Sequence, residues 1–405
     1  MNYIVLIISV VILFGVADLL TVQYPRLQKQ LYYIAICITY FLFVIRYYYG
    51  PDIASYVPFY ENPPTLNQIL NPDISLEFEK GYALFNLVCY RIGLDYWGMT
   101  VIITTLYFIA IALLFRHVPS NRSFGLMVLI ALDYALIYAQ NRQCLAVSFF
   151  IFSVLLLRNK RFLWAILCAV MCFSMHKSAP FVLLLTFIYF FVRRLRAKEY
   201  VYQIILFVLI IMVFVPLGKI SSNLISALPF SSSIIASLQH HFMLGTNIQV
   251  IVLLYASVLI CIQHLIQYGD KRSFTWISYI AFLGIVITIC FYQYYFILNR
   301  IRSYFLPFII VYVLQMVHSS TQIKAKHIPY FSLLRQTVAI IALLFSIHSV
   351  FSFYRMSKKI SCPLHKACTI FNLIDTPSWA VKNQQMKIAK HFWENDYMKE
   401  NTNKL

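Results

Sequence analysis

Charged side chains are scarce in this sequence. Asp, Glu, Lys and Arg make up only 12% of its 405 residues, whereas 61% of the residues are hydrophobic. Because about a quarter of the residues in a typical soluble domain are charged, this chain cannot cover itself with a polar surface. The composition therefore excludes a soluble globular protein and indicates that the lipid bilayer is its solvent. Repeated apolar runs of about 20 residues, each able to cross the hydrocarbon core, agree with this.

Acidic residues are scarcer still, with 14 Asp and Glu against 33 Lys and Arg. A basic balance can indicate a nucleic-acid partner, but in a polytopic membrane protein basic residues gather in cytoplasmic loops and set the topology. No nucleic-acid partner is therefore expected. The first apolar run, 2–22, has no Lys or Arg ahead of it, since Arg26 is the first. It lacks the charged start of a cleaved signal peptide and is predicted to be a retained span.

Motifs of nucleotide chemistry are missing as well. The sequence has no Walker loop, no Asp-x-Asp nucleotide-sugar motif and no glycine-rich phosphate cradle, which disfavours a soluble nucleotide-linked donor. Most of the nine cysteines lie within apolar runs. Cys168 and Cys172 share a helix face, but no His or acidic residue joins them to form a metal site. No metal and no cofactor are expected.

The apolar runs predict an all-α polytopic membrane protein with about 12 transmembrane helices, in a range of roughly 10–13. Pro, Gly and clustered charge separate the runs. The predicted spans are 2–22, 31–45, 98–115, 124–140, 143–157, 162–175, 178–192, 201–217, 247–267, 274–295, 301–318 and 334–353. They form one membrane domain over residues 1–353, and a polar, basic C-terminal tail follows at 354–405.

The loops between the predicted spans are of two kinds. Every second loop is short and basic, and the positive-inside rule places these loops in the cytoplasm. The opposite, external side then receives a large loop at 46–97, in which acids outnumber bases, and a second stretch at about 218–246. This alternation puts the tail outside although it is basic, so its side stays open. If the tail is periplasmic, Cys362 and Cys368 could form a disulfide.

Isolated polar residues gather on the predicted external face. Arginines are the least expected there, because the positive-inside rule disfavours them. A guanidinium can bind phosphate through two parallel hydrogen bonds and stays charged when partly buried, so several arginines on one face predict an anionic substrate. Carboxylates and a histidine nearby could supply a general base for a hydroxyl nucleophile. The polar residues on this face include Arg46, Asp52, Glu79, Arg142, Gln143, His176, Arg300 and Arg302.

Each of these residues also has a simpler interpretation. Arginines at helix ends commonly extend to lipid phosphates. A lone histidine at a turn, such as His176, is more often structural than catalytic. Asp52 followed by Tyr56 could order a loop, and Gly-Pro-Asp at 50–52 is a turn signal in its own right.

Two further polar positions lie at or inside apolar stretches. Asp133 falls within a predicted span, where an ionisable group is costly and usually faces a cavity. On a continuous helix, Gln140 would lie two turns further along the same face. Glu79 begins an apolar stretch, 81–93, that is predicted to be an interfacial or re-entrant helix.

Taken in order, these residues resemble EpsG-like and Wzy-type polymerases of bacterial exopolysaccharide and O-antigen. The similar elements are an Arg-x(3)-Gly-x-Asp-x(3)-Tyr cluster after an early span, a Glu-x-Gly, an Arg-Gln with a following alanine, a His-x-Ser-Ala and a late Arg before a Tyr. The residues that carry them are Arg46, Gly50, Asp52, Tyr56, Glu79, Gly81, Arg142, Gln143, Ala146, His176, Ser178, Ala179, Arg300 and Tyr304.

The resemblance implies a multi-pass glycosyltransferase of the bacterial inner membrane with its active face in the periplasm. Such polymerases move a growing glycan from undecaprenyl diphosphate onto a carrier-linked repeat unit, without nucleotide or metal, and work with a chain-length regulator. Here Asp52, Glu79 or His176 would deprotonate the acceptor hydroxyl, and the sequence does not decide which. The diphosphate and the glycan would be bound by Arg46, Tyr56, Arg142, Gln143, Arg300, Arg302 and Tyr304.

Three other functions remain as alternatives. A lipid-linked glycan ligase or a membrane acyltransferase of exported polysaccharide comes next after the polymerase. The acyltransferase also uses His and Arg in a polytopic scaffold, but its His motif is expected near the start of the chain, whereas His176 lies well inside it. A flippase fits less well, because it should show internal repeats and helices broken at the membrane midplane, and no convincing repeat is visible.

Overall fold

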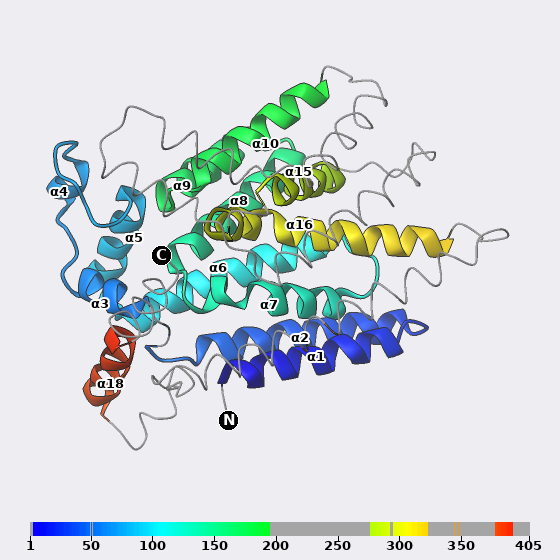
Figure 1. The fold of residues 1–405 in the computed structure, drawn as a ribbon, viewed down its shortest axis with the longest axis horizontal. Helices are drawn as coiled ribbons and strands as arrows, with labels where there is room; N and C mark the ends of the chain where they lie inside the picture. Colours follow the sequence, from blue (N-terminus) through cyan, green and yellow to red (C-terminus); the bar gives the residue numbers. More distant parts are fainter. Residues whose placement is uncertain are drawn as a thin grey trace. The chain divides into compact units, whose positions relative to one another are not determined.

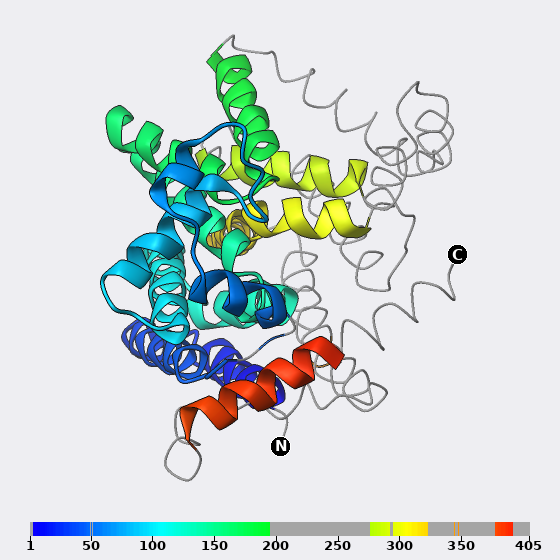
Figure 2. The same cartoon turned by 90° about the vertical axis from the view of Figure 1, so that its left-hand side faces the viewer.

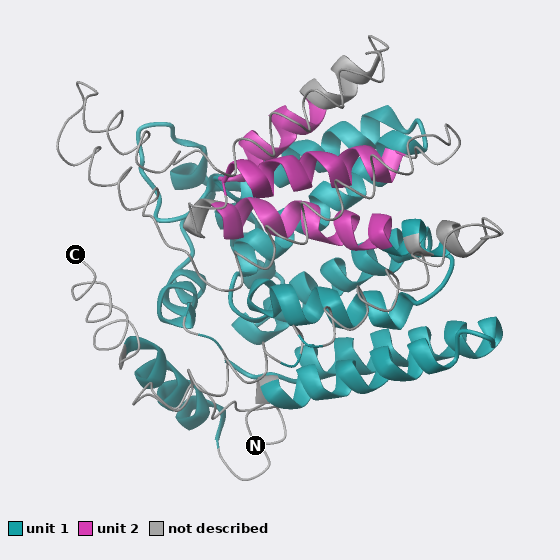
Figure 3. Cartoon of the chain, turned by 45° about the vertical axis from the view of Figure 1, so that its right-hand side comes forward, with its two compact units in different colours: residues 1–177, 314–405 teal, residues 178–313 magenta. Residues whose placement is uncertain are grey.

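The structure, a computed structural model, describes residues 3–48, 50, 52–194, 276–291, 295–322, 344, 347 and 377–391. Every helix or strand element that it assigns in these ranges is an α-helix, which confirms the predicted all-α class. Figure 1 labels these helices. The chain divides into two compact units, which Figure 3 shows in different colours. Unit 1 comprises residues 1–177 and 314–405, and unit 2 comprises residues 178–313.

Unit 1 contains most of the described helices. They are α1 (Tyr3–Leu20), α2 (Pro25–Val44), α3 (Ile53–Glu61), α4 (Leu66–Leu70), α5 (Lys80–Arg91), α6 (Tyr96–Phe115), α7 (Arg122–Tyr138), α8 (Asn141–Arg158), α9 (Phe162–Met175) and α18 (Ser378–His391). Helices α1, α2 and α6 to α9 fall on predicted spans. Helix α2 begins at Pro25 rather than near residue 31, because proline in the first turn has a helical φ and its missing N–H costs no intrahelical bond.

Three described helices are long and apolar enough to cross a membrane: α2, α6 and α8. The part Val5–Leu20 of α1, helix α9 of unit 1 and helix α15 (Trp276–Cys290) of unit 2 are apolar but shorter. These helices make the chain a membrane protein, whereas the number of spans stays a prediction. The predicted spans 201–217 and 247–267, the stretch 218–246, and Cys362 and Cys368 lie outside the described residues. Of the predicted span 334–353, the structure describes residues 344 and 347 alone.

The helices of unit 1 alternate in direction, so that their ends meet in two groups. In the first group, the side-chain amide of Asn141, where α8 begins, donates to the hydroxyl of Tyr96, where α6 begins, at 2.9 Å. Trp97 Nε1 donates to the carbonyl of Val44, where α2 ends, at 2.9 Å. We call this group the α3 end of unit 1, because α3 lies there.

The second group of helix ends carries basic residues. Gln28 of α2 donates to Asn121, which precedes α7, at 2.9 Å. Arg158 at the end of α8 contacts His117, which follows α6, with 2.9 Å between Nη1 and Nδ1. Helices α6 and α8 therefore run in the same direction and pack against each other, and α7, which connects them in sequence, runs antiparallel to both. We call this group the basic end of unit 1; the side of the membrane that it faces stays a prediction.

The predicted large loop at 46–97 folds into three short helices, α3, α4 and α5. Thr65 and Gln68 form a reciprocal capping box that begins α4. Helix α5 confirms that the apolar stretch 81–93 is helical, and Glu79 is its N-cap residue. Helix α5 packs against α9 and α4, and α3 packs against α5 and α6. The loop is thus a packed layer at the α3 end.

Helix α7 is broken at Asp133, whose backbone is non-helical at φ −137° and ψ 29°. The helix ends at Tyr138, and Gln140 is the N-cap residue of α8. The expectation that Gln140 continues the face of Asp133 is therefore wrong. No continuous helix joins the two residues, because the chain reverses direction between α7 and α8.

Unit 2 has three described helices: α10 (Ala179–Arg194), α15 and the part of α16 (Tyr295–Gln322) up to Val313. Helix α10 packs against α15. Gly284 of α15 lies so close to Phe305 of α16 that an added Cβ would come within 2.9 Å of the phenylalanine Cγ. The absence of a side chain at Gly284 allows α15 and α16 to pack together.

Candidate functional site

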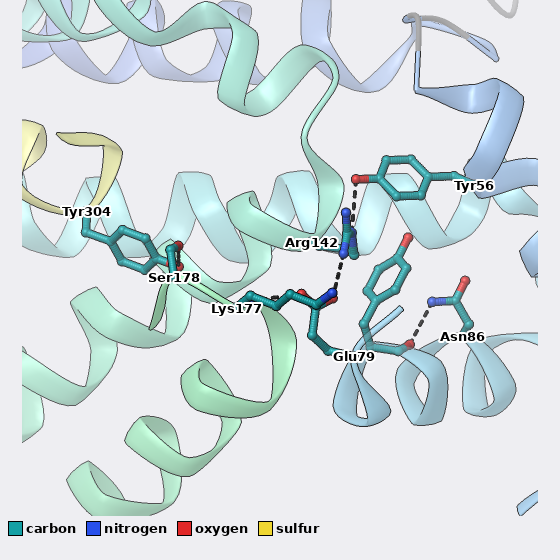
Figure 4. Close-up of polar contacts among 8 residues, drawn as sticks. Tyr56, Glu79, Asn86, Arg142, Lys177, Ser178 and Tyr304 are labelled. Carbon is teal, nitrogen blue, oxygen red and sulfur yellow. Dashed lines mark hydrogen bonds and ion pairs between the residues drawn. The ribbon is translucent and has the colours of Figure 1, made fainter. Parts of the chain in front are cut away.

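Arg142, in the first turn of α8, is held by side chains from the 46–97 segment. Its Nη1 forms an ion pair with Glu79 Oε2 at 2.6 Å, and its Nε donates to the Tyr56 hydroxyl at 3.3 Å (Figure 4). The guanidinium also lies over the ring of Phe78, with Cζ 4.5 Å from the ring centroid. We call Tyr56, Phe78, Glu79 and Arg142 the arginine cluster. It joins α3, the start of α5 and the start of α8.

Glu79 connects a fourth segment to the arginine cluster. The backbone N–H of Lys177, just after α9, donates to Glu79 Oε1 at 2.9 Å. Each carboxylate oxygen therefore has its own donor, the Arg142 guanidinium on Oε2 and the Lys177 backbone on Oε1. A charged carboxylate with both oxygens bonded in this way is fixed in orientation.

The position of Glu79 depends on a close approach of α5 to α9. A Cβ added at Gly81 would lie 2.5 Å from the Cβ and 2.6 Å from the carbonyl oxygen of Ser174. Only glycine fits here, because any side chain would push the two helices apart. This contact gives a physical reason for the Glu-x-Gly element: the glycine brings α5 against α9, and the carboxylate two residues earlier reaches the turn that follows α9.

The Glu79 carboxyl is kept ionised by its surroundings. Burial alone would raise its pKa, but the positive charge of Arg142, the hydrogen bonds that it accepts and the nearby His176 lower the pKa below its usual value. Ionised at neutral pH and bonded at both oxygens, Glu79 is a weak proton acceptor. Its geometry is that of a residue that orients Arg142.

The Tyr56 hydroxyl is kept protonated. Burial, and then the negative charge of Asp52, raise the pKa of Tyr56 to about 12. The phenol oxygen accepts from Arg142 Nε, and its own hydrogen stays available to a further acceptor. The bonds to Glu79 and Tyr56 use two of the five N–H donors of Arg142 within the described residues. The remaining donors can bind an anion.

His176 and Asp52 flank the arginine cluster. His176 ends α9, is 7% exposed, and lies close enough to Glu79 for their charges to interact. Asp52 precedes α3 and acts electrostatically on Tyr56. The structure therefore brings Arg142 together with four other residues singled out in the sequence, which come from three separate segments of the chain: Asp52, Tyr56, Glu79 and His176.

Arg46 is buried at the α3 end, 6% exposed, and lines a cavity of about 10 Å³ together with Tyr96 and Asn141. This is roughly the room that one water molecule needs. The backbone at Gly50 has φ +117°, and a Cβ there would lie 3.1 Å from the carbonyl oxygen of Tyr138. The glycine of the first motif thus lets the segment after α2 pass against the end of α7.

The remaining predicted site residues are placed separately. Gln143 is buried in the first turn of α8, 2% exposed. In unit 2, Tyr304 is buried and its hydroxyl accepts from Ser178 Oγ at 3.2 Å. Arg300 is exposed and Arg302 is buried. Residues two apart on a helix point to different faces, so α16 does not present these two guanidinium groups on one face.

Sequence reasoning missed several residues that build the two ends of unit 1. Phe78 lies under the Arg142 guanidinium, and Asn141 joins α8 to α6; each is adjacent in sequence to a residue that was singled out. Asp18 of α1 was also missed. Its carboxylate accepts from the backbone N–H of Phe124 at 3.0 Å and so caps the start of α7 at the basic end. An acid within an apolar run was the available signal, the same one that drew attention to Asp133.

In the part of the chain that the structure describes, no three His, Cys, Asp or Glu side chains gather as metal ligands do. The described side chains of this site offer hydrogen-bond donors, charge and a histidine. The arrangement at the α3 end suits recognition of an anionic group, with a fixed guanidinium, a protonated phenol and an imidazole near one another.

Comparison with known proteins shows which protein family the chain belongs to. Neither the curated proteins nor the solved structures include a match to this chain. The model of the EpsG family, in contrast, matches residues 29–366, which include every element of the resemblance noted in the sequence. Because the match covers most of the chain, this protein belongs to the EpsG family.

Proposed function

We propose that this protein is a membrane glycosyltransferase that polymerises a bacterial polysaccharide. Its membership of the EpsG family supports a membrane protein of polysaccharide synthesis. The observation that carries the finer proposal is the fixed Arg142 guanidinium, which uses two of its five N–H donors on Glu79 and Tyr56 within the described residues, beside a protonated Tyr56 and near His176. Such donors suit the diphosphate of a lipid-linked glycan.

The proposed reaction transfers a growing glycan from its carrier to a new repeat unit. A hydroxyl of the acceptor sugar attacks the anomeric carbon of the donor glycan, forming the glycosidic bond. The bond between that carbon and the diphosphate oxygen breaks, and the undecaprenyl diphosphate leaves with the electron pair. Arg142 and Tyr56 stabilise the negative charge that develops on the leaving oxygen. The sugar–diphosphate linkage supplies the free energy, so no nucleotide is consumed.

His176 takes the proton of the acceptor hydroxyl in this proposal. Imidazole has a proton affinity suited to catalysis near neutral pH. The neighbouring Glu79 carboxylate would face the imidazolium that forms and stabilise it. Glu79 itself is the weaker candidate, since both of its oxygens accept hydrogen bonds and its pKa is lowered. Asp52, close to Tyr56, is the alternative base.

The remaining predicted contacts follow the same proposal. Arg46, Gln143, Arg300, Arg302 and Tyr304 would bind further parts of the diphosphate or the glycan. The substrate is an undecaprenyl diphosphate-linked oligosaccharide reached from the bilayer. The enzyme would lie in the inner membrane with the α3 end of unit 1 in the periplasm, and a chain-length regulator would be its protein partner.

A strain that lacks this gene tests the proposal in cells. Polymer chain lengths are compared after complementation with the wild type, Arg142→Lys or Arg91→Lys. Arg142→Lys keeps the charge but loses the planar fork that contacts both Glu79 and Tyr56. Arg91, on the exposed last turn of α5, provides a matched control in the same segment.

We expect the deletion strain to carry single repeats only. Wild type and Arg91→Lys should restore long chains, and Arg142→Lys should not, at equal amounts of membrane protein. Loss of every repeat in the deletion strain would instead indicate a flippase or a ligase. Normal chain lengths with Arg142→Lys would contradict the assigned role of the arginine cluster.

A further inference from the structure

The C-terminal helix α18 lies beyond residues 29–366, the part of the chain that matches the family model. It is nevertheless docked, because Val381, Gln385 and Ala389 recur at a helical spacing and are each 1–2% exposed. Helix α18 packs against α3, which lies at the same end of unit 1 (Figure 2). The opposite face of α18 is exposed and includes Trp379 and Lys387.

Two polar contacts fix α18 to the segments on either side of Tyr56. Ser378, the first residue of α18, bonds through its side chain to the hydroxyl of Tyr47, which precedes α3. Lys382 forms an ion pair with Glu61, the last residue of α3. Helix α18 therefore contacts the chain both before α3 and where α3 ends.

Helix α3 needs such support. It has only nine residues and contains Pro58, and helices of this length are not stable on their own. Its position in the fold comes from packing against α5, α6 and α18. It carries Tyr56, whose hydroxyl accepts from Arg142. A shift of α3 would therefore change the distance between the Tyr56 hydroxyl and the Arg142 guanidinium.

We infer that α18 positions the arginine cluster: by binding Tyr47 and Glu61 it holds α3 so that Tyr56 reaches Arg142. Lys382 is then a positioning residue, which acts on the site through Glu61 and Tyr56. The inference also places the C-terminal helix on the same side of the membrane as residues 46–97. It rests on the proposed function only for its effect on polymer synthesis, since the docking of α18 can be tested without activity.

Labelling of single cysteines in an otherwise cysteine-free full-length chain tests the docking. The probe is a membrane-impermeant thiol reagent, added to sealed vesicles of one orientation. Trp379→Cys and Glu77→Cys should react from the same side, because Trp379 is 67% exposed and Glu77 is an exposed residue of the 46–97 segment. Val381→Cys should react much more slowly than Trp379→Cys, because residue 381 faces the docked interior. Reaction of Trp379→Cys only from the side opposite Glu77→Cys, or equal rates at 379 and 381, would overturn the docking.

Charge reversal tests the positioning. Lys382→Glu and Glu61→Lys should each lower the rate of polymer synthesis, by about fivefold or less as expected for a partly exposed ion pair. The double variant with exchanged charges should recover the wild-type rate. Lys387→Glu, on the exposed face of the same helix, should have no effect. In a Tyr56→Phe background, Lys382→Glu should cause no further loss, because its effect passes through the Tyr56 hydroxyl.

These outcomes separate the inference from the proposed function. Suppose that labelling shows α18 to be docked. If the single charge reversals then leave polymer synthesis unchanged, or if their losses persist in the Tyr56→Phe background, positioning by α18 is overturned and the glycosyltransferase proposal is not affected. Docking by labelling with no polymerising activity in the wild type would instead contradict the proposed function.

Discussion

At the scale of single residues, the site depends on how one guanidinium is held. Arg142 has a carboxylate on Nη1, a phenol on Nε and an aromatic ring beneath its plane. Each contact removes rotational freedom from a long side chain, so less entropy is lost when an anion binds. An arginine that merely extended to lipid phosphates would have no need for partners from two other segments of the chain.

Replacing Glu79 by Gln should loosen this arrangement. A glutamine can accept from only one of the two donors, Arg142 Nη1 or the Lys177 backbone, while its NH₂ faces the other. We expect the free energy of unfolding to fall by about 1–3 kcal/mol, as for lost hydrogen bonds to a charged group. Thermal unfolding in nanodiscs measures this. Glu77→Gln, an exposed carboxyl two residues earlier, is the matched control and should change little.

The same pair of proteins should differ in pH dependence. The pKa of Glu79 is lowered in the folded protein, so its ionised form stabilises the fold above the pKa of the unfolded chain, and this contribution is lost as the pH falls through the folded value. The stability advantage of the wild type over Glu79→Gln should therefore be constant above about pH 5 and shrink below it. An advantage that grew on acidification would show that Glu79 is protonated in the native state.

At the scale of elements, two glycines decide which segments meet. Gly50 lets the chain after α2 pass against the end of α7, and Gly81 lets α5 touch α9. The short helices of the 46–97 segment have little stability by themselves, so these contacts set where their side chains point. Gly81 in particular sets the distance from Glu79 to the backbone of Lys177.

Gly81→Ala tests this element-scale role. The new Cβ would overlap Ser174, and overpacking of this kind costs about 1–3 kcal/mol. We expect polymer synthesis to fall at least tenfold, roughly what 1.4 kcal/mol of lost stabilisation gives, because Glu79 moves away from Lys177. The measurement is the polymer yield per amount of purified protein. Leu84→Ala, on the exposed face of the same helix, should leave the yield unchanged.

Helices were easier to predict from the sequence than their contacts. The apolar runs of α6, α8 and α9 end at charges or turn residues, so local signals mark them to within a few residues. The break at Asp133 was not predicted, because a single aspartate with apolar residues on both sides and no adjacent Pro or Gly is not a helix-breaking signal. Glu79 and Arg142 were both singled out, but nothing in a sequence shows that residues 63 positions apart form an ion pair. The opposite faces of Arg300 and Arg302 follow from helix periodicity, which the sequence analysis did not apply to them.

At the scale of the whole molecule, the alternating helices of unit 1 separate two kinds of surface. The α3 end carries the packed 46–97 segment and the arginine cluster. The basic end carries Arg158 and His117. A bilayer between the two ends would place the basic residues in the cytoplasm, by the positive-inside rule, and the arginine cluster outside.

Cysteine accessibility tests this placement. In a cysteine-free background, Glu77→Cys should react with an impermeant thiol reagent added to the periplasmic side, and Arg161→Cys, exposed just before α9, only after the membrane is opened. Both positions are exposed in the structure, so a difference in their reaction reports the side of the membrane rather than burial. The reverse pattern would put the arginine cluster in the cytoplasm and away from the proposed substrate.

The central claim is that the arginine cluster binds the diphosphate of a lipid-linked glycan during polymerisation. The most direct measurement uses the purified protein in lipid vesicles with undecaprenyl diphosphate-linked repeat units and no nucleotide. We predict that glycans longer than one repeat form, with one carrier diphosphate released for each new linkage, and that Arg142→Lys forms none while Arg91→Lys equals the wild type. Absence of elongation by the wild type, or equal elongation by Arg142→Lys, would contradict the account.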